Sequence, residues 1–133
     1  MDKQGYIIAV DQGTTGTTGV VVDSLGKVLC QSYQEIRQIY PEMGWVEHDP
    51  SEIFSSVLNV IEDLLEETEI NIQQILGLGI ANQRETTLVW EKTTGSPVYN
   101  AIVWQCRRTS DICHDLKLKG LSCLLYTSPS PRD

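Results

Sequence analysis

Basic side chains are scarce in this sequence of 133 residues, which has 10 Lys and Arg against 18 Asp and Glu and a formal net charge of −8. The cations are scattered and form no basic stripe of the kind that meets the phosphates of a nucleic acid. A chain with a net negative charge can still bind a polyanion through backbone amides and a metal ion. The composition therefore argues against a nucleic-acid-binding surface and leaves phosphate ligands open.

Long apolar runs and targeting signals are also missing. No apolar run approaches the roughly 20 residues that a membrane span needs, and no small-residue cleavage site follows the short apolar run near the start. The four cysteines, Cys30, Cys106, Cys113 and Cys123, show no CxxC spacing and no neighbouring pair of histidines. We therefore expect reduced thiols in a cytoplasmic protein, without a disulfide framework or a zinc site.

Short strands dominate the first part of the chain, whose length suffices for one modest domain. Residues 7–10 and 19–22 are rich in β-branched side chains, and the polar turn at 23–27 leads into a third strand at 28–36. Three strands joined by tight turns form an antiparallel meander. Residues 40–49, YPEMGWVEHD, are predicted to form a loop.

A strong helix start follows this loop. Asp49 is a suitable N-cap, Pro50 suits the first turn, and Glu52 completes a pattern that resembles a capping box. Apolar residues then recur at helical spacing, namely Ile53, Val57, Val60, Ile61, Leu64 and Leu65. The acidic cluster EDLLEETE lies largely outside this apolar face, so we interpret it as solvated surface.

Further strands and a second helix complete the pattern. ILGLGIAN, residues 75–82, is predicted as a buried strand, and TTLVWE and VYNAIVW as a hairpin around the turn KTTGSP. A last helix, from about residue 108 to 119, ends at Gly120 as a C′ residue. Three antiparallel strands, a helix and then further strands predict an α/β fold with a mixed sheet.

The loop DQGTTGTT, between the first two strands, has the composition of a phosphate site. Its glycines allow close approach of the backbone to a ligand, its amides can turn inward, and its threonines add hydroxyl donors. The candidate phosphate-binding residues are Gly13, Thr14, Thr15 and Gly16. The alternative interpretation is an ordinary hairpin whose Gly and Thr residues only satisfy the turn.

Two polar side chains begin this loop. Asp11 stands at the strand end, where its carboxylate would repel phosphates unless a Mg²⁺ ion lay between them. Gln12 could orient a water molecule or a phosphate oxygen. These residues together predict a site for a metal-bound phosphate.

A second polar cluster follows the strand at 75–82. Arg84 offers a guanidinium fork and Glu85 a carboxylate, which can donate to and accept from neighbouring hydroxyl groups. Trp104 could form an apolar wall beside a carbon backbone. This is the combination that a small polyol requires. The alternatives are a surface salt bridge between Arg84 and Glu85 and a tryptophan in the core.

Neither the GxxxxGK(S/T) loop nor the GxGxxG fingerprint occurs in the chain. DQGTTG instead resembles the first phosphate loop of the actin, hexokinase and sugar-kinase ATPase superfamily. Together with GWVEHDP, NQRETT and YNAIVWQCRRT, it makes the chain similar to the glycerol kinases of the FGGY carbohydrate-kinase family, from about residue 6 to 121.

This resemblance implies a ribonuclease H-like fold of two domains with the active site between them. It also implies transfer of the γ-phosphoryl group of ATP to a terminal hydroxyl of glycerol with Mg²⁺, in a full-length protein that can be a homo-oligomer. The implied roles are metal and γ-phosphate for Asp11, phosphate for the loop at 13–16, glycerol hydroxyls for Arg84 and Glu85, and the glycerol carbons for Trp104. Thr18 stands where many relatives have an Arg that contacts the nucleotide.

The resemblance further implies an incomplete N-terminal domain over residues 1–122, because the family's catalytic Asp would lie downstream of residue 133. Residues 123–133, CLLYTSPSPRD, instead resemble the translation of a transposase adaptor used in sequencing-library preparation. We expect this chain alone to be an inactive fragment. Two alternatives stay open: another FGGY sugar kinase, and a non-catalytic nucleotide-binding module like actin.

Overall fold

A computed structural model of the chain describes residues 5–122. The adaptor-like tail predicted at 123–133, which includes Cys123, lies outside the described residues. The other three cysteines are free thiols, as expected. No helix within the described range combines the length and the apolar character that a bilayer crossing requires.

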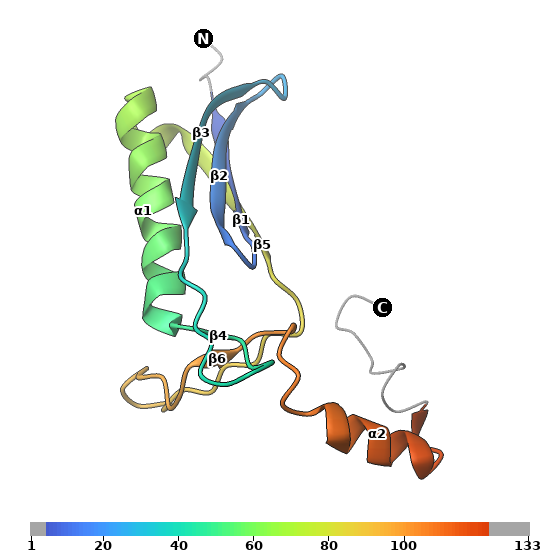
Figure 1. The fold of residues 1–133 in the computed structure, drawn as a ribbon. Helices are drawn as coiled ribbons and strands as arrows, with labels where there is room; N and C mark the ends of the chain where they lie inside the picture. The colour runs from blue at the N-terminus through green and yellow to red at the C-terminus, as the bar shows by residue number, and fades with distance from the viewer. Residues whose placement is uncertain (1–4, 123–133) are drawn as a thin grey trace.

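A four-stranded mixed sheet forms the body of the molecule (Figure 1). Its strands are β1 (Tyr6–Gln12), β2 (Gly16–Asp23), β3 (Val28–Glu35) and β5 (Ile75–Asn82), in the order β3-β2-β1-β5. The first three strands are antiparallel, and β5 runs parallel to β1. The predicted meander and mixed sheet are therefore confirmed. The prediction that residues 75–82 form a buried strand is wrong, because β5 is the edge strand of the described sheet and all its residues except the half-buried Ile75 are exposed.

Helix α1 (Pro50–Thr68) covers one face of this sheet and connects β3 to β5 through a short 3-10 helix, Ile72–Gln74. Alternate residues of the strands face α1, and the buried core consists of Tyr6, Ile8, Val10, Val21, Cys30, Val60 and Leu64. Gly19 of β2 lies directly under the helix, where an added Cβ would come within 2.4 Å of a Val60 methyl carbon. The absence of a side chain at this position thus sets how closely α1 approaches the sheet.

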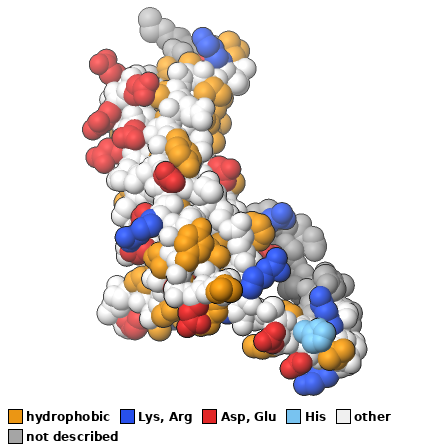
Figure 2. Space-filling view, in the orientation of Figure 1, with side chains coloured by type: hydrophobic (Ala, Val, Ile, Leu, Met, Phe, Trp, Pro, Cys, Tyr) orange, Lys and Arg blue, Asp and Glu red, His pale blue; other side chains and the backbone are white. Residues whose placement is uncertain are grey.

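The acidic face of α1 is exposed, as predicted, and its red side chains run along the left of Figure 2. Asp49 is the N-cap, and its Oδ1 accepts a hydrogen bond from the Ser51 amide at 2.8 Å. The predicted capping-box role of Glu52 is wrong. Its carboxylate accepts from the Arg37 amide at 2.7 Å instead, because the chain after β3 brings this donor beside the first turn of the helix.

A second, two-stranded sheet lies at one end of the first and consists of β4 (Glu47–His48) and β6 (Ala101–Ile102). β4 falls within residues 40–49, so the prediction of a loop over that whole segment was wrong. The predicted hairpin after β5 is present only in part. Hydrogen bonds join Val98 to Val89 and Ile102 to Thr87, but continuous strands do not form.

A buried carboxylate holds this second sheet to the chain that follows it. Glu47 is fully buried and accepts hydrogen bonds from the Tyr99 hydroxyl at 3.0 Å, the Asn100 amide at 2.9 Å and the Arg108 guanidinium. Arg108 also lies over the Trp45 ring, 3.9 Å from its centroid. Burial by itself raises the pKa of Glu47, but the hydrogen bonds from Arg108, Asn100 and Tyr99 outweigh it and lower the pKa below its ordinary value.

Helix α2 (Ser110–Leu118) stands apart from the main sheet (Figure 1). Gly120 follows it with a φ of 74°, and the Gly120 and Leu121 amides donate to the carbonyls of Lys117 and Leu116. This is the Schellman arrangement, in which the left-handed residue is commonly glycine. The predicted helix end is therefore confirmed.

The close contact at Gly19 predicts the effect of adding one methyl group. Gly19→Ala should lower the free energy of unfolding by about 1–3 kcal/mol, because its Cβ overlaps the buried side chains of α1. Gly77→Ala in β5 is the matched control, since no atom lies within 4 Å of a Cβ there. Urea unfolding of the two variants should separate them, and equal midpoints would contradict this account of the α1 contact.

The environment of Glu47 predicts a pH dependence of stability. Because its pKa is lower in the folded than in the unfolded chain, the unfolded chain binds more protons below the ordinary value of 4.5. The stability that Glu47 contributes is thus complete above pH 4.5 and is lost as the pH falls through the lower, folded pKa. Urea midpoints measured from neutral to acidic pH should fall less steeply for Glu47→Gln than for the parent chain. Parallel curves for the two proteins would show that Glu47 does not contribute to the pH dependence of stability.

Candidate functional site

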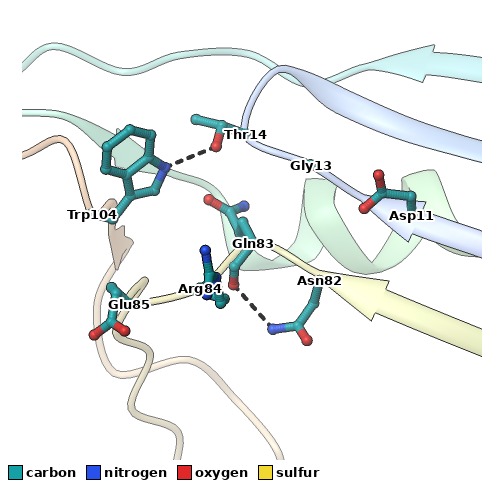
Figure 3. Close-up of a pocket in the computed structure, with 8 residues that line it drawn as sticks. All are labelled: Asp11, Gly13, Thr14, Asn82, Gln83, Arg84, Glu85 and Trp104. Carbon is teal, nitrogen blue, oxygen red and sulfur yellow. Dashed lines mark hydrogen bonds between the residues drawn. The ribbon is translucent and has the colours of Figure 1, made fainter. Parts of the chain in front are cut away.

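An open pocket of about 490 Å³ lies where the loop after β1 meets the chain after β5 (Figure 3). Its lining residues are Asp11, Gly13, Thr14, Asn82, Gln83, Arg84, Glu85 and Trp104. The structure therefore brings together six of the eight residues predicted for the site, and two of them, Thr14 and Trp104, are 90 positions apart in the chain. Thr15 and Gly16 do not line this pocket.

The parallel pairing of β1 and β5 positions the two polar clusters. In the register of the sheet, Asp11 lies opposite Ala81, and Gln12 lies opposite Asn82. Because parallel strands end at the same sheet edge, the residues that follow both strands emerge side by side. Asp11 is exposed at this edge, on the opposite side of the pocket from Trp104 (Figure 3).

The glycine and threonine loop makes a tight turn between β1 and β2. The Gly13 amide donates to the Gly16 carbonyl at 2.9 Å, and neither the Thr14 nor the Thr15 amide donates to another described residue. Thr15 is exposed, whereas Gly16 is buried as the first residue of β2. A Cβ at Gly16 would lie 2.5 Å from the Tyr33 hydroxyl, so this glycine allows β3 to pack closely.

Arg84 and Glu85 are both exposed in the pocket. Within residues 5–122, the ion pairs join Arg37 to Glu52 and Arg108 to Glu47, so Arg84 and Glu85 do not form the salt bridge considered as an alternative. Glu85 has a φ of 64°, in the left-handed region that few residues other than glycine adopt. Such backbone strain is concentrated at functional sites, where it fixes the direction of a side chain.

Trp104 connects the two clusters. Its indole Nε1 donates a hydrogen bond of 2.9 Å to the Thr14 hydroxyl (Figure 3), and the residue is 54% exposed. This tryptophan is not a core residue, which was the alternative interpretation. It presents an aromatic surface to the pocket beside Arg84 and Glu85.

Gln12 does not have the place expected for a residue that orients water or phosphate. It is only 5% exposed, its amide nitrogen donates to the Gly13 carbonyl, and its amide oxygen accepts from Gln83. It faces the α1 side of β1 because strand residues alternate, and Asp11 therefore points the other way.

Asn82 and Gln83 also line the pocket, although neither was predicted from the sequence as a site residue. The signal was available, because both belong to the motif NQRE, which directly follows the last apolar residues of β5. Polar residues at the carboxyl end of a strand in a mixed or parallel sheet are together candidates for a binding site.

The described residues contain no group of three or more His, Cys, Asp or Glu side chains placed to hold a metal ion. Asp11 is the acidic side chain of the pocket on the side of the glycine and threonine loop. One carboxylate suits Mg²⁺, which keeps several waters and is commonly shared between one or two carboxylates and substrate phosphates. The Asp11 carboxylate therefore fits a Mg²⁺ ion that binds together with a phosphate ligand.

Comparisons with known proteins identify the family of the chain. Residues 6–128 match the N-terminal domain of the FGGY family of carbohydrate kinases. Glycerol kinase of Vibrio campbellii is 54% identical over 121 residues, which are 91% of this chain and 24% of that protein. Glycerol kinase of a Thermoanaerobacter species is 54% identical over 115 residues, 86% of this chain and 23% of that protein. The chain thus spans about a quarter of the length of the curated relatives it matches.

Solved structures of FGGY kinases share the fold. Gluconate kinase from Lactobacillus acidophilus superposes with a TM-score of 0.82 at 29% identity, over 92% of this chain and 24% of the other. Glycerol kinase of Plasmodium falciparum with ADP gives a TM-score of 0.78 at 29% identity, over 87% and 23%. The predicted fold class is therefore confirmed, and this chain, whose described residues form an incomplete N-terminal domain, belongs to the FGGY family of carbohydrate kinases.

Proposed function

We propose that this chain is the N-terminal part of a glycerol kinase, which transfers the γ-phosphoryl group of ATP to a terminal hydroxyl of glycerol. The observation that carries the proposal is the single pocket in which the glycine and threonine loop meets Arg84, Glu85 and Trp104. A phosphate donor and a hydroxyl acceptor must lie next to each other for in-line transfer. The identity of 54% to glycerol kinases supports glycerol as the acceptor.

The phosphate side of the proposed site consists of Asp11, Gly13, Thr14 and Thr15. The Thr14 and Thr15 amides donate to no other described residue, so both are available to phosphate oxygens. Gly16 contributes to this side by letting the turn close under β3. Mg²⁺ held through Asp11, phosphate oxygens and water would neutralise charge on the transferred group. Thr18 lies opposite Asp11 on β2 and offers a hydroxyl group beside it.

The polyol side consists of Arg84, Glu85 and Trp104. Each glycerol hydroxyl can both donate and accept, so a guanidinium donor next to a carboxylate acceptor can satisfy it. The exposed ring of Trp104 covers the carbon backbone, and its hydrogen bond to Thr14 keeps this wall beside the phosphate loop.

Other parts of the active site are proposed to come from the part of the complete protein that this chain does not cover. These parts are the carboxylate that accepts the proton of the attacking hydroxyl, the second phosphate loop and the adenosine contacts. We further propose that residues 1–122 are the native part of the chain and that residues 123–133 derive from an adaptor, although the family match extends to residue 128. The complete enzyme is proposed to be cytoplasmic.

Two other functions are less well supported. The fold matches xylulose and gluconate kinases as well as glycerol kinases, so another FGGY substrate is the second candidate. A non-catalytic, actin-like module needs no polyol side, and three residues that fit a polyol lie in the same pocket as the phosphate loop.

A chimera tests the substrate. Residues 1–121 of this chain would replace the matching segment of Vibrio campbellii glycerol kinase, and the chimera should phosphorylate glycerol in preference to xylulose and gluconate. Arg84→Ala should then lower kcat/KM for glycerol by about 10- to 100-fold, the effect of losing a charged hydrogen bond. Arg107→Ala is the control, because Arg107 is exposed and does not line this pocket. Equal effects of the two substitutions would contradict the role of Arg84.

The isolated 133-residue chain should not phosphorylate glycerol, because the proposed proton acceptor and the adenosine contacts are missing from it. A coupled assay of the purified chain with glycerol and Mg²⁺–ATP, compared with the chimera at equal concentration, checks this expectation. Glycerol phosphorylation activity that co-purifies with the chain would contradict this expectation and show that these residues suffice for catalysis.

A further inference from the structure

Four side chains behind the glycine and threonine loop form a ring of hydrogen bonds, which we call the amide ring: Gln12, Gln38, His48 and Gln83. Gln38 Nε2 donates to the Thr14 carbonyl at 2.8 Å, and Gln12 Nε2 donates to the Gly13 carbonyl at 2.8 Å. His48 contacts both Gln38 and Gln83, and Gln83 contacts Gln12, so hydrogen bonds connect Gln38 to Gln12. The amide ring therefore begins and ends on neighbouring residues of the loop.

The direction of each hydrogen bond in the amide ring follows from the two loop carbonyls, which can only accept. Gln38 Nε2 faces a carbonyl, so its Oε1 is the atom that meets His48 Nε2 at 2.8 Å, and His48 Nε2 must carry a proton. Gln12 Nε2 faces the other loop carbonyl, so its Oε1 meets Gln83, which must present its Nε2 to Gln12 Oε1 at 3.1 Å and to His48 Nδ1 at 3.4 Å. Gln83 Oε1 then accepts from the Thr86 hydroxyl. His48 Nδ1 is then an acceptor, which leaves the imidazole neutral with its proton on Nε2.

The amide ring acts on the part of the loop that meets the ligand. It holds the carbonyls of Gly13 and Thr14 through hydrogen bonds. In a trans peptide the N–H points opposite to the carbonyl of the same peptide unit, so the Thr14 and Thr15 N–H groups point away from the amide ring. Both N–H groups donate to no other described residue. Gln83 also immediately precedes Arg84, so the same amide ring joins both sides of the pocket.

We propose that His48 is a positioning residue whose neutral Nε2–H tautomer closes the amide ring and thereby holds the Thr14 and Thr15 amides toward the phosphate ligand. The identity of that ligand rests on the proposed function, whereas the link between His48 and the loop does not. Protonation of His48 opens the amide ring, because a second N–H then faces the Gln83 amide group, which is itself a donor.

The surroundings of His48 keep it neutral. It is 1% exposed, and burial lowers the pKa of its imidazole, while the Glu52 carboxylate on the first turn of α1 acts in the opposite direction. Glu52 is itself paired with Arg37. The neighbouring Glu47 is engaged by Arg108, and strand alternation directs it to the other face of β4. Gln38 and Gln83, which contact the imidazole directly, carry no charge.

The first test uses NMR on the 133-residue chain, whose only two histidines are His48 and His114. Long-range ¹H–¹⁵N spectra should show His48 as the neutral Nε2–H tautomer, with exposed His114 as the comparison signal in the same sample. The Thr14 and Thr15 amides and the Trp104 indole N–H should shift with pH along the titration of His48. A proton on Nδ1 of neutral His48, or loop signals that ignore its titration, would overturn the proposal.

Two substitutions separate positioning from simple packing. His48→Ala removes both hydrogen bonds, and exchange of the Trp104 indole N–H with solvent should accelerate at least tenfold. His48→Gln keeps one donor and one acceptor, so exchange should stay within about twofold of the parent while the pH dependence of the loop signals disappears. The Val21 amide in the core of the main sheet reports global folding. Equal exchange rates of the Trp104 indole N–H in His48→Ala and in the parent would overturn the proposal. Thr14 and Thr15 amide signals that still depend on pH in His48→Gln would also overturn it.

These measurements require neither ATP nor glycerol. If they succeed while the chimera fails to phosphorylate glycerol, the proposed function is wrong and the positioning role stands. If the chimera phosphorylates glycerol while the loop signals are independent of His48, the positioning role is wrong and the proposed function stands.

Discussion

The parallel pairing of β1 with β5 is the constraint on which the rest of this structure depends. It brings the end of β1, at Asp11, to the same sheet edge as the residues that follow Asn82, although about seventy positions separate them. A parallel pair needs a crossover connection, and α1 provides it by packing on the sheet over Gly19. The distance between the two halves of the pocket therefore depends on contacts in the core, far from any ligand.

The pocket combines exposed groups with a buried support. Asp11, Arg84 and Glu85 are exposed and face the ligand space, which suits side chains that bind phosphate, metal and hydroxyl groups. Behind them, the amide ring fixes the loop backbone through neutral hydrogen bonds. Glu47 performs a similar task for the second sheet, because its three donors tie β4 to the chain around Arg108. Such supporting contacts hold a site in one geometry before the ligand arrives.

Much of the fold and most of the site could be predicted from local patterns. The meander, the N-cap at Asp49 and the C′ glycine at Gly120 follow from strand composition and capping chemistry, which act over a few residues. β4 and β6 could not be predicted, since two-residue strands have no periodicity. Gln12 was given a ligand-facing role because a sequence shows the residue type but not which face of the strand it occupies. The roles of the site residues remain predictions.

A double-mutant cycle between Thr14 and Trp104 tests most directly whether the two sequence clusters form one site. Thr14→Val removes the hydroxyl acceptor and Trp104→Phe removes the indole donor of their 2.9 Å hydrogen bond. The free energies of unfolding of the parent, the single variants and the double variant should reveal a coupling of about 0.5–1.5 kcal/mol. Additive effects, within about 0.3 kcal/mol, would contradict the account because the two clusters would then not be in contact.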